Sequence, residues 1–163
     1  MKVIFLDIDG VLNYKKWRLS QSKFSRRKAK PIDERKVKLL SYIIKKTKAK
    51  IVLSSSWRFI MNKECFKMKS RAYKVHKIFN KYKIRIADMT GNDFIGNDKS
   101  VWGRGYEILS YLEKHSKIKK YAVVDDAVLE LQTFNKEHLF LTDYNKDGLN
   151  EKIAQSVISY LNS

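Results

Sequence analysis

Two carboxylates stand two residues apart at the end of the first apolar run of the sequence. The run Val3–Leu6 leads into Asp7, and Ile8, Asp9 and Gly10 follow. Because side chains alternate along a strand, Asp7 and Asp9 are expected on the same side. Buried carboxylates carry a large desolvation penalty unless a cation offsets it, and Mg²⁺ prefers carboxylate and carbonyl oxygen. The pattern indicates a metal-assisted site, with a strand that ends in an Asp-rich turn as the simpler alternative.

A second acidic pair follows another apolar run. Tyr121–Val124 leads directly into Asp125 and Asp126. The carboxyl ends of neighbouring parallel strands meet at one edge of a sheet, so this pair is expected beside the first. Two acidic pairs at adjacent strand ends can form an octahedral Mg²⁺ site of carboxylates, a carbonyl and water.

Hydroxyl and basic side chains are expected at the same edge. Three consecutive serines, Ser54–Ser56, follow the run Ile51–Leu53, and Arg58 comes soon after them. Serine hydroxyls and an arginine fork can bind a phosphate, although serines equally serve as helix caps. Lys99 and Arg104, upstream of the second acidic pair, are cations suited to holding a phosphate and a carboxylate together.

Five apolar runs alternate with helical patterns, which predicts an α/β fold with a parallel sheet flanked by helices. The expected strands are Lys2–Ile8, Lys50–Ser54, Ile84–Ala87, Tyr121–Val124 and Leu139–Thr142. Helices are expected after an N-cap at Asp33, over Lys63–Tyr82, over Gly103–Lys114 and over Asn150–Leu161. With 163 residues and 44% hydrophobic content, the chain is expected to be one globular domain, residues 1–163.

Positive charge is the most unusual property of the composition. The chain has 35 Lys and Arg against 17 Asp and Glu, a formal net charge of +18 that attracts polyanions. The basic segment, about residues 14–30, has no acid, and Tyr14, Trp17 and Phe24 are interleaved with its cations. Cations for phosphates and aromatic faces for bases are typical of a nucleic-acid surface. A generally lysine-rich surface is the alternative, and at least one of the three aromatic residues is expected to pack against the core.

Cysteine usage and the first apolar run bear on location. The single cysteine, Cys65, leaves no internal disulfide, which fits a reducing compartment and a packing role for its side chain. The run Val3–Leu6 is too short for a signal peptide or a membrane span. We therefore expect a soluble cytoplasmic protein with no membrane partner.

Four groups of residues, in this order, resemble the four motifs of the haloacid dehalogenase (HAD) superfamily. They are Asp7–Leu12 on the first strand, serine after the second strand, a basic residue that opens the helix before the fourth strand, and Asp125 with Asp126 after that strand. The stretches Leu53–Arg58, Gly103–Ile108, Val124–Asp126 and Leu141–Asp143, the last followed by Gly148 and Leu149, more narrowly resemble the HAD domain associated with RNA-repair proteins.

The resemblance implies a Rossmann-like HAD core, in which a five-stranded parallel sheet is flanked by helices. Superfamily members that act on small metabolites commonly carry a cap domain over the site. Here the residues between Ser55 and Arg104 must also supply one long helix and the third strand, so little of the chain remains for a lid. We expect a minimal cap or none.

The resemblance also implies a phosphatase that uses two aspartates. Asp7 would attack phosphorus to give an aspartyl-phosphate, and Asp9 would protonate the leaving oxygen and then activate water. Mg²⁺ would be held by Asp7, the Asp9 carbonyl and Asp125, with Asp126 as a further or water-mediated ligand. The second aspartate favours phosphoryl chemistry over dehalogenation.

Phosphate-binding roles follow from the same resemblance. Ser55, or Ser54 one residue earlier, would hydrogen-bond the phosphoryl group that is transferred. Arg104 would fill the basic position, where lysine is commoner, so Lys99 stays open as an alternative.

An open basic site suits a phosphate at the end of a macromolecule. The narrower resemblance implies RNA ends, favoured over DNA ends, and Arg26, Arg27 and Lys28 are the residues expected to guide the strand. A ligase or kinase is the expected class of protein partner, since removal of a terminal phosphate can precede ligation. Two alternatives stay open: a phosphatase for small molecules or nucleotides, and a nucleic-acid-binding module with a vestigial site. The presence of all the expected acids weighs against the second of these.

Overall fold

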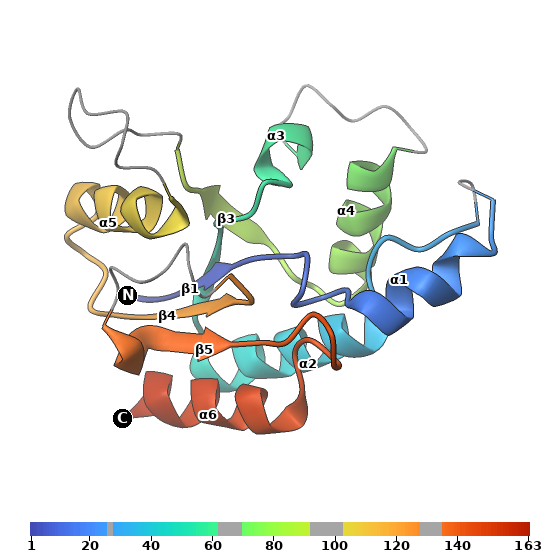
Figure 1. Ribbon diagram of the computed structural model, residues 1–163. Helices are drawn as coiled ribbons and strands as arrows, with labels where there is room; N and C mark the ends of the chain where they lie inside the picture. Colours follow the sequence, from blue (N-terminus) through green and yellow to red (C-terminus); the bar gives the residue numbers. More distant parts are fainter. Residues whose placement is uncertain (26–27, 62–69, 92–102, 128–134) are drawn as a thin grey trace.

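A five-stranded sheet, parallel throughout, forms the centre of the computed structural model (Figure 1). The structure describes residues 1–25, 28–61, 70–91, 103–127 and 135–163. The strands are β1 (Lys2–Leu6), β2 (Lys50–Leu53), β3 (Ile86–Met89), β4 (Lys120–Asp125) and β5 (Leu139–Leu141). Their order across the sheet is β3-β2-β1-β4-β5, so β1 is the central strand. The predicted α/β fold with a five-stranded parallel sheet is confirmed.

Helices flank this sheet on both faces. The described helices are α1 (Lys15–Ser22), α2 (Glu34–Thr47), α3 (Arg58–Met61), α4 (Arg71–Lys81), α5 (Arg104–Lys114) and α6 (Glu151–Asn162), with a short 3-10 helix, η3 (Lys136–His138). Apolar residues of α2, α4 and α6 pack in one core on one face, and those of α5 pack in a second core on the other face (Figure 1).

The alternation of side chains along β1 explains how both faces are covered. Ile4 and Leu6 belong to the core shared with α2, α4 and α6. Val3 and Phe5 point to the opposite face and join Ile108 of α5 in the second core. A parallel sheet that is covered on both faces needs central strands that are largely apolar, and β1 is apolar from Val3 to Leu6.

The chain reverses its direction across the sheet at β1. From β1 it winds outward through β2 to β3, and it then returns to β4 on the other side of β1. Leu6 of β1 stands opposite Leu53 of β2 and Val124 of β4. In open α/β sheets, ligands bind in the crevice outside the carboxyl ends of strands at such a switch point. Asp7 after β1 and Asp125 at the end of β4 occupy this position.

The five predicted strands and the N-cap at Asp33 are confirmed. The Asp33 carboxylate accepts the backbone N–H of Arg35 at 2.9 Å and begins α2. β3 covers Ile86–Met89, two residues later than the predicted Ile84–Ala87. The reason is that Ile84 still belongs to the turn after α4, where its N–H donates to the Phe79 carbonyl at 2.9 Å.

Two helices differ from the sequence prediction. α4 begins at Arg71, where the Ser70 hydroxyl accepts the N–H of Tyr73 and caps the helix, and residues 63–69 of the predicted helix lie outside the described residues. α1 lies inside the basic segment, where the sequence pattern predicts no helix. Its N-cap is Tyr14, whose side chain makes no capping hydrogen bond, so the start of α1 has no sequence signal.

Two expectations concern what surrounds this core. None of the described helices combines the length and the apolar character that a membrane crossing requires. The prediction of a minimal cap also involves residues 62–69 and 92–102, which lie outside the described residues, as does Cys65.

The segment before α6 is fastened to the turn after β1. The N–H of Leu149 donates to the Val11 carbonyl at 2.9 Å, and the Thr142 hydroxyl donates to the Gly10 carbonyl at 2.9 Å. Gly148 has a φ of 61°, and a Cβ atom there would lie 2.7 Å from the Val11 carbonyl oxygen. Residues far apart in the sequence therefore hold the turn that leaves the central strand.

Gly148→Ala is expected to lower the free energy of unfolding by about 1–3 kcal/mol, because both the left-handed φ and the close carbonyl oppose a Cβ atom. Urea denaturation followed by circular dichroism measures the change. Lys48→Gly is the matched variant, since Lys48 caps α2 at a φ of 59° and removal of its Cβ should leave stability equal or slightly higher. A loss below about 0.5 kcal/mol for Gly148→Ala would contradict this account.

Candidate active site

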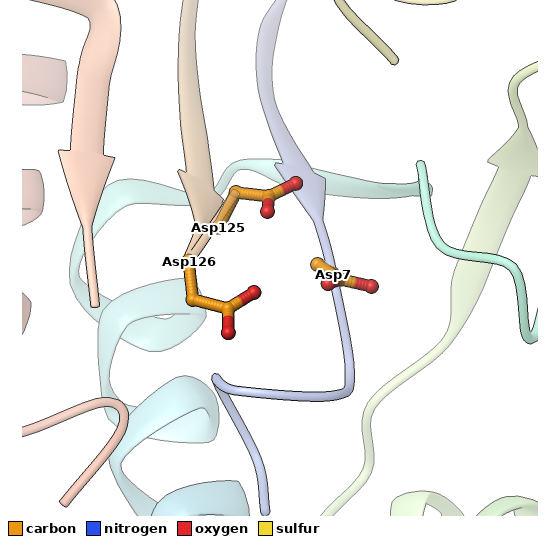
Figure 2. Close-up of side chains that lie close together, drawn as sticks. All are labelled: Asp7, Asp125 and Asp126. Atoms are coloured by element: carbon orange, nitrogen blue, oxygen red, sulfur yellow. The ribbon is translucent and has the colours of Figure 1, made fainter. Parts of the chain in front are cut away.

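Three aspartates converge where β1 and β4 end. Asp7, Asp125 and Asp126 each offer one carboxylate oxygen, and these atoms all lie within 4.8 Å of one another. Figure 2 shows the three side chains close together at the ends of two neighbouring strands. Asp125 is fully buried and Asp7 is 3% exposed. The structure thus brings Asp7 of the first acidic pair together with both members of the second, more than a hundred residues away in the sequence, while Asp9 is not part of this cluster.

The guanidinium of Arg104, the first residue of α5, lies between two of these carboxylates. Its Nη1 donates to Asp7 Oδ2 at 3.0 Å and to the two oxygens of Asp125 at 2.8 and 2.7 Å. Arginine suits this position because its charge persists at any accessible pH and its fork can bind several oxygens. Three carboxylates against one guanidinium still leave an excess of negative charge.

Burial and the neighbouring carboxylate shift the ionisation of the cluster. The pKa of Asp7 is raised to about 7, first by burial and then by Asp125, while Arg104 and the Ser55 hydroxyl oppose the shift. The pKa of Asp126 is also raised, again first by burial and then by Asp125. Groups with such shifted pKa values in a crevice are typical of functional sites.

The carboxylate of Asp9 is held by two side chains from different parts of the chain. Asn13 Nδ2 donates to Asp9 Oδ1 at 2.7 Å, and Trp57 Nε1 donates to Asp9 Oδ2 at 2.9 Å. The same Asn13 amide donates to the Pro31 carbonyl at 3.3 Å. The half-buried Asp9 is therefore oriented by uncharged donors, and the role of its carbonyl as a metal ligand stays a prediction.

The serines after β2 differ in their surroundings. The Ser55 hydroxyl lies close enough to the carboxyl group of Asp7 to oppose the rise of its pKa, and its oxygen accepts the backbone N–H of Trp57 at 3.4 Å. Ser54 is fully buried, and its hydroxyl has no hydrogen-bond partner within the part of the chain that the structure describes. Of the two alternatives left open by the sequence, Ser55 is the serine that lies near Asp7, and its contact with phosphate stays a prediction.

The other predicted phosphate-binding residues fall into two groups. Arg58 donates from Nη2 to Glu107 of α5 and from Nη1 to the Ser55 carbonyl at 3.2 Å, so it ties α3 to α5, and its contact with phosphate stays a prediction. Lys28 is exposed on the segment after α1. The remaining three, Lys99, Arg26 and Arg27, lie outside the described residues.

Gly10 lets the turn after β1 pass close to the second acidic pair. Its φ is 77°, and a Cβ atom there would lie 2.1 Å from both Cγ and Oδ2 of Asp126. No side chain larger than hydrogen fits this approach. The glycine that follows Asp9 is thus explained by the close approach of the Asp126 side chain.

Asn13 and Trp57 are site residues that the sequence analysis did not assign. Asn13 lies four residues after Asp9, and a polar side chain in a glycine-containing turn is a signal that could have identified it. Trp57 reaches Asp9 from the neighbouring strand end, a contact between residues 48 positions apart that no local pattern shows.

Comparison with known families decides the class of the protein. A family model described as the HAD domain in Swiss Army Knife RNA repair proteins matches residues 3–154. The chain belongs to this family. Comparison with curated proteins gave no match, and comparison with solved structures gave none. Membership of this HAD family confirms the resemblance seen in the motifs and indicates a hydrolase of the HAD phosphatase type.

The residues at the crevice fit the Mg²⁺ that HAD domains generally use. Asp7, Asp125 and Asp126 present only oxygen donors around one space, which is the donor set of a hard divalent cation. Burial and then the neighbouring Asp125 raise the pKa values of Asp7 and Asp126, and a bound cation would offset both the loss of solvation and the repulsion.

Asp7→Asn is expected to stabilise the metal-free fold near neutral pH. An unfolded chain ionises this carboxyl near its ordinary pKa of 3.8, whereas the folded chain ionises it at about 7. Between these values the folded state binds the extra proton, so the contribution of Asp7 to stability falls as the pH rises through this window. Above it the variant should melt several degrees higher than the wild type, and at about pH 4 the two should be alike.

Differential scanning fluorimetry over a pH series, in EDTA and in Mg²⁺, measures the melting temperatures of the wild type and the variant. Saturating Mg²⁺ should raise the melting temperature of the wild type more than that of Asp7→Asn, because the variant loses one ligand. Asp143→Asn is the control, since hydrogen bonds from the Asn145 backbone and from Lys146 lower the pKa of this exposed carboxyl. An identical pH dependence for the wild type and Asp7→Asn would show that Asp7 does not carry the shift.

Proposed function

We propose that this HAD domain is a Mg²⁺-dependent phosphatase that removes a terminal phosphate from nucleic-acid ends, in the first place RNA ends. The observation that carries the proposal is the arrangement of three aspartates, Arg104 and Ser55 around one space where β1 and β4 end. The family supplies the class of reaction. The substrate class is supported by the net charge of +18 and by the association of the family with RNA repair.

In the first half-reaction the phosphoryl group passes to Asp7. A carboxylate oxygen of Asp7 attacks phosphorus, the bond from phosphorus to the leaving oxygen breaks, and Asp9 gives that oxygen a proton. Mg²⁺ bound by Asp7, Asp125 and Asp126 would supply the positive charge that lets an anionic phosphate approach a carboxylate.

Arg104 and Ser55 are positioned to assist this transfer. Arg104 donates a hydrogen bond to Asp7, and the Ser55 hydroxyl lies near the same carboxyl group, so both donors stand at the place where phosphorus must arrive. Donors fixed in advance at the developing charge stabilise a transition state without a cost of reorganisation. We assign to these two residues the binding of the oxygens of the transferred group.

In the second half-reaction water attacks the phosphorus of the aspartyl-phosphate. Asp9 accepts a proton from this water, the bond between phosphorus and Asp7 breaks, and inorganic phosphate leaves with Asp7 restored. The hydrogen bonds from Asn13 and Trp57 orient Asp9 for both steps. Each oxygen of Asp9 that accepts one of them has a second lone pair that can hold the transferred proton.

The proposed substrate is a strand end rather than a free metabolite. A net charge of +18 on a small domain attracts polyanions and accelerates their encounter with the site. Loss of a terminal phosphate leaves a hydroxyl group, which is the group that a ligase or a polynucleotide kinase uses. An enzyme of one of these two classes is the partner that we propose.

Asp7→Asn is expected to lower kcat/KM at least about 1,000-fold, because it removes the nucleophile and one ligand charge with little change in shape. Phosphate release is measured from oligonucleotides with a 3′-phosphate or a 5′-phosphate, from mononucleotides and from an aryl phosphate, in Mg²⁺ and in EDTA. All activity should disappear in EDTA, and Asp143→Asn is the matched control. Full activity in EDTA, or more than a few per cent of it in Asp7→Asn, is incompatible with the proposal.

Asp9→Asn is expected to impair oligonucleotide ends more than an aryl phosphate, because a poor leaving group depends most on a proton donor. We expect a loss of about 100-fold or more in kcat on the oligonucleotide and a clearly smaller loss on the aryl ester. Trp57→Phe keeps a ring but removes the hydrogen bond to Asp9. It should also lower kcat more on the oligonucleotide than on the aryl ester, with smaller losses on both substrates than Asp9→Asn. Equal losses on both substrates would exclude Asp9 as the acid.

A further inference from the structure

A cavity lined with positive charge lies between α1 and the start of α4, two helices that stand side by side in Figure 1. We call it the basic hollow; its walls are α1, Phe24, residues 29–31 and residues 70–74 at the start of α4. Its volume is about 630 Å³, within the range of about 300–1,000 Å³ that ligand sites usually have. Of the ten described residues that line it, four are cationic and none is acidic.

The cations approach the basic hollow from separate segments. Arg18 comes from α1, and Arg71 and Lys74 come from the first turns of α4. Lys30 pairs with an acid of α2 at 2.8 Å, which offsets part of its charge. The ammonium of Lys74 donates to the Ala29 carbonyl at 2.8 Å and fixes α4 to the segment after α1. Such a wall of guanidinium and ammonium groups matches the charge of a phosphate backbone.

Two series of contacts connect the basic hollow with Asp9. The guanidinium of Arg71 lies 4.9 Å from the centroid of the Trp57 ring, and the Trp57 indole donates to Asp9. On another side Pro31 lines the hollow, and its carbonyl accepts from the Asn13 amide that also holds Asp9. A ligand in the hollow would therefore contact Arg71 and Pro31, which in turn contact the two residues that orient the proposed acid.

Phe24 adds an aromatic surface to the basic hollow. Its side chain is 44% exposed, and the Lys23 ammonium lies 5.7 Å from its ring centroid. Tyr14 differs, because it is buried and its hydroxyl donates to Asp33, so it is an aromatic residue of the basic segment that packs inside. An exposed ring among cations can stack on a base of any type.

On the basis of the proposed function, we propose that the basic hollow binds the unpaired strand whose terminal phosphate reaches Asp7. Backbone phosphates lie on Arg18, Arg71 and Lys74, and one base stacks on Phe24. An unpaired strand is the occupant that fits, because its bases are available for stacking, whereas a duplex keeps them inside and presents its backbone. The hollow thereby distinguishes a strand end from a free phosphate ester.

The test measures binding apart from turnover. A fluorescein-labelled uridine hexanucleotide is titrated with the Asp7→Asn protein over a series of salt concentrations, and fluorescence anisotropy reports the affinity. Arg18→Gln combined with Lys74→Gln should weaken binding about tenfold or more at low salt and reduce the slope of log K against log salt by about 1.4, or about 0.7 for each lost phosphate contact. Phe24→Ala should weaken binding about tenfold without a change in slope.

A matched double variant controls for the overall charge. Lys45→Gln combined with Lys152→Gln removes the same two charges from exposed positions on α2 and α6. It should retain the affinity and the slope of the parent protein. Circular dichroism spectra of all variants show whether each of them is folded, and Phe24→Ala tests the hollow through an exposed residue if the double variant fails to fold.

Several outcomes would overturn the inference. Equal slopes for the two double variants would mean that binding depends on general charge. If Arg18→Gln with Lys74→Gln weakens the binding of an RNA duplex of the same strand length as much as that of the hexanucleotide, an unpaired strand is excluded as the specific occupant. Uridine monophosphate that competes as well as the hexanucleotide would make the hollow a mononucleotide site.

Turnover separates this inference from the proposed function. In the active protein, the ratio of kcat/KM for the phosphorylated hexanucleotide to that for an aryl phosphate should fall about tenfold in Arg18→Gln with Lys74→Gln. An unchanged ratio together with normal phosphate release would refute the role of the hollow and leave the phosphatase intact. A wild-type protein that releases phosphate from no substrate would refute the proposed function, and the binding titration would still decide the occupant of the hollow.

Discussion

The repulsion among buried carboxylates at the ends of β1 and β4 is the constraint on which the rest of the structure depends. Asp7 and Asp125 are buried, and Asp125 adds to the effect of burial in raising the pKa values of Asp7 and Asp126. Arg104 offsets part of this charge, and its guanidinium holds α5 over the end of the sheet. A divalent cation among the same oxygens would complete the compensation. The unfavourable free energy of these buried acids would thus be the source of the affinity for metal and phosphate that we propose.

Apolar packing and hydrogen bonds between uncharged groups keep these acidic side chains close together. β1 is apolar on both faces and is covered by two separate cores, so its end is rigidly placed beside the end of β4. The turn that follows is held from the distant segment before α6 by Thr142 and Leu149. Asp9 is oriented by the amide of Asn13 and the indole of Trp57. These uncharged donors orient Asp9 without placing a further net charge beside the carboxylates.

The parts that were predicted from the sequence are those that local physics determines. Apolar strands followed by acids are visible as short runs, and the cap at Asp33 satisfies the backbone N–H of Arg35 two residues away. α1 was not predicted because it lacks a capping side chain and buries none of its residues. The partners of Asp9 and the basic hollow were not predicted because they depend on how separate strand ends and helices meet. Trp57 gives no local sign of the carboxylate that it reaches.

The indole of Trp57 contacts the guanidinium of Arg71 with its ring and the carboxylate of Asp9 with its N–H. One side chain therefore contacts both a residue of the wall that would hold a strand, Arg71, and the carboxylate that we propose moves protons. Binding energy gained far from the phosphorus atom can then be used to align Asp9 in the transition state. Discrimination between a long strand and a short ester would be expressed in kcat as well as in KM, so that the enzyme senses the length of its substrate through the rate of the chemical step.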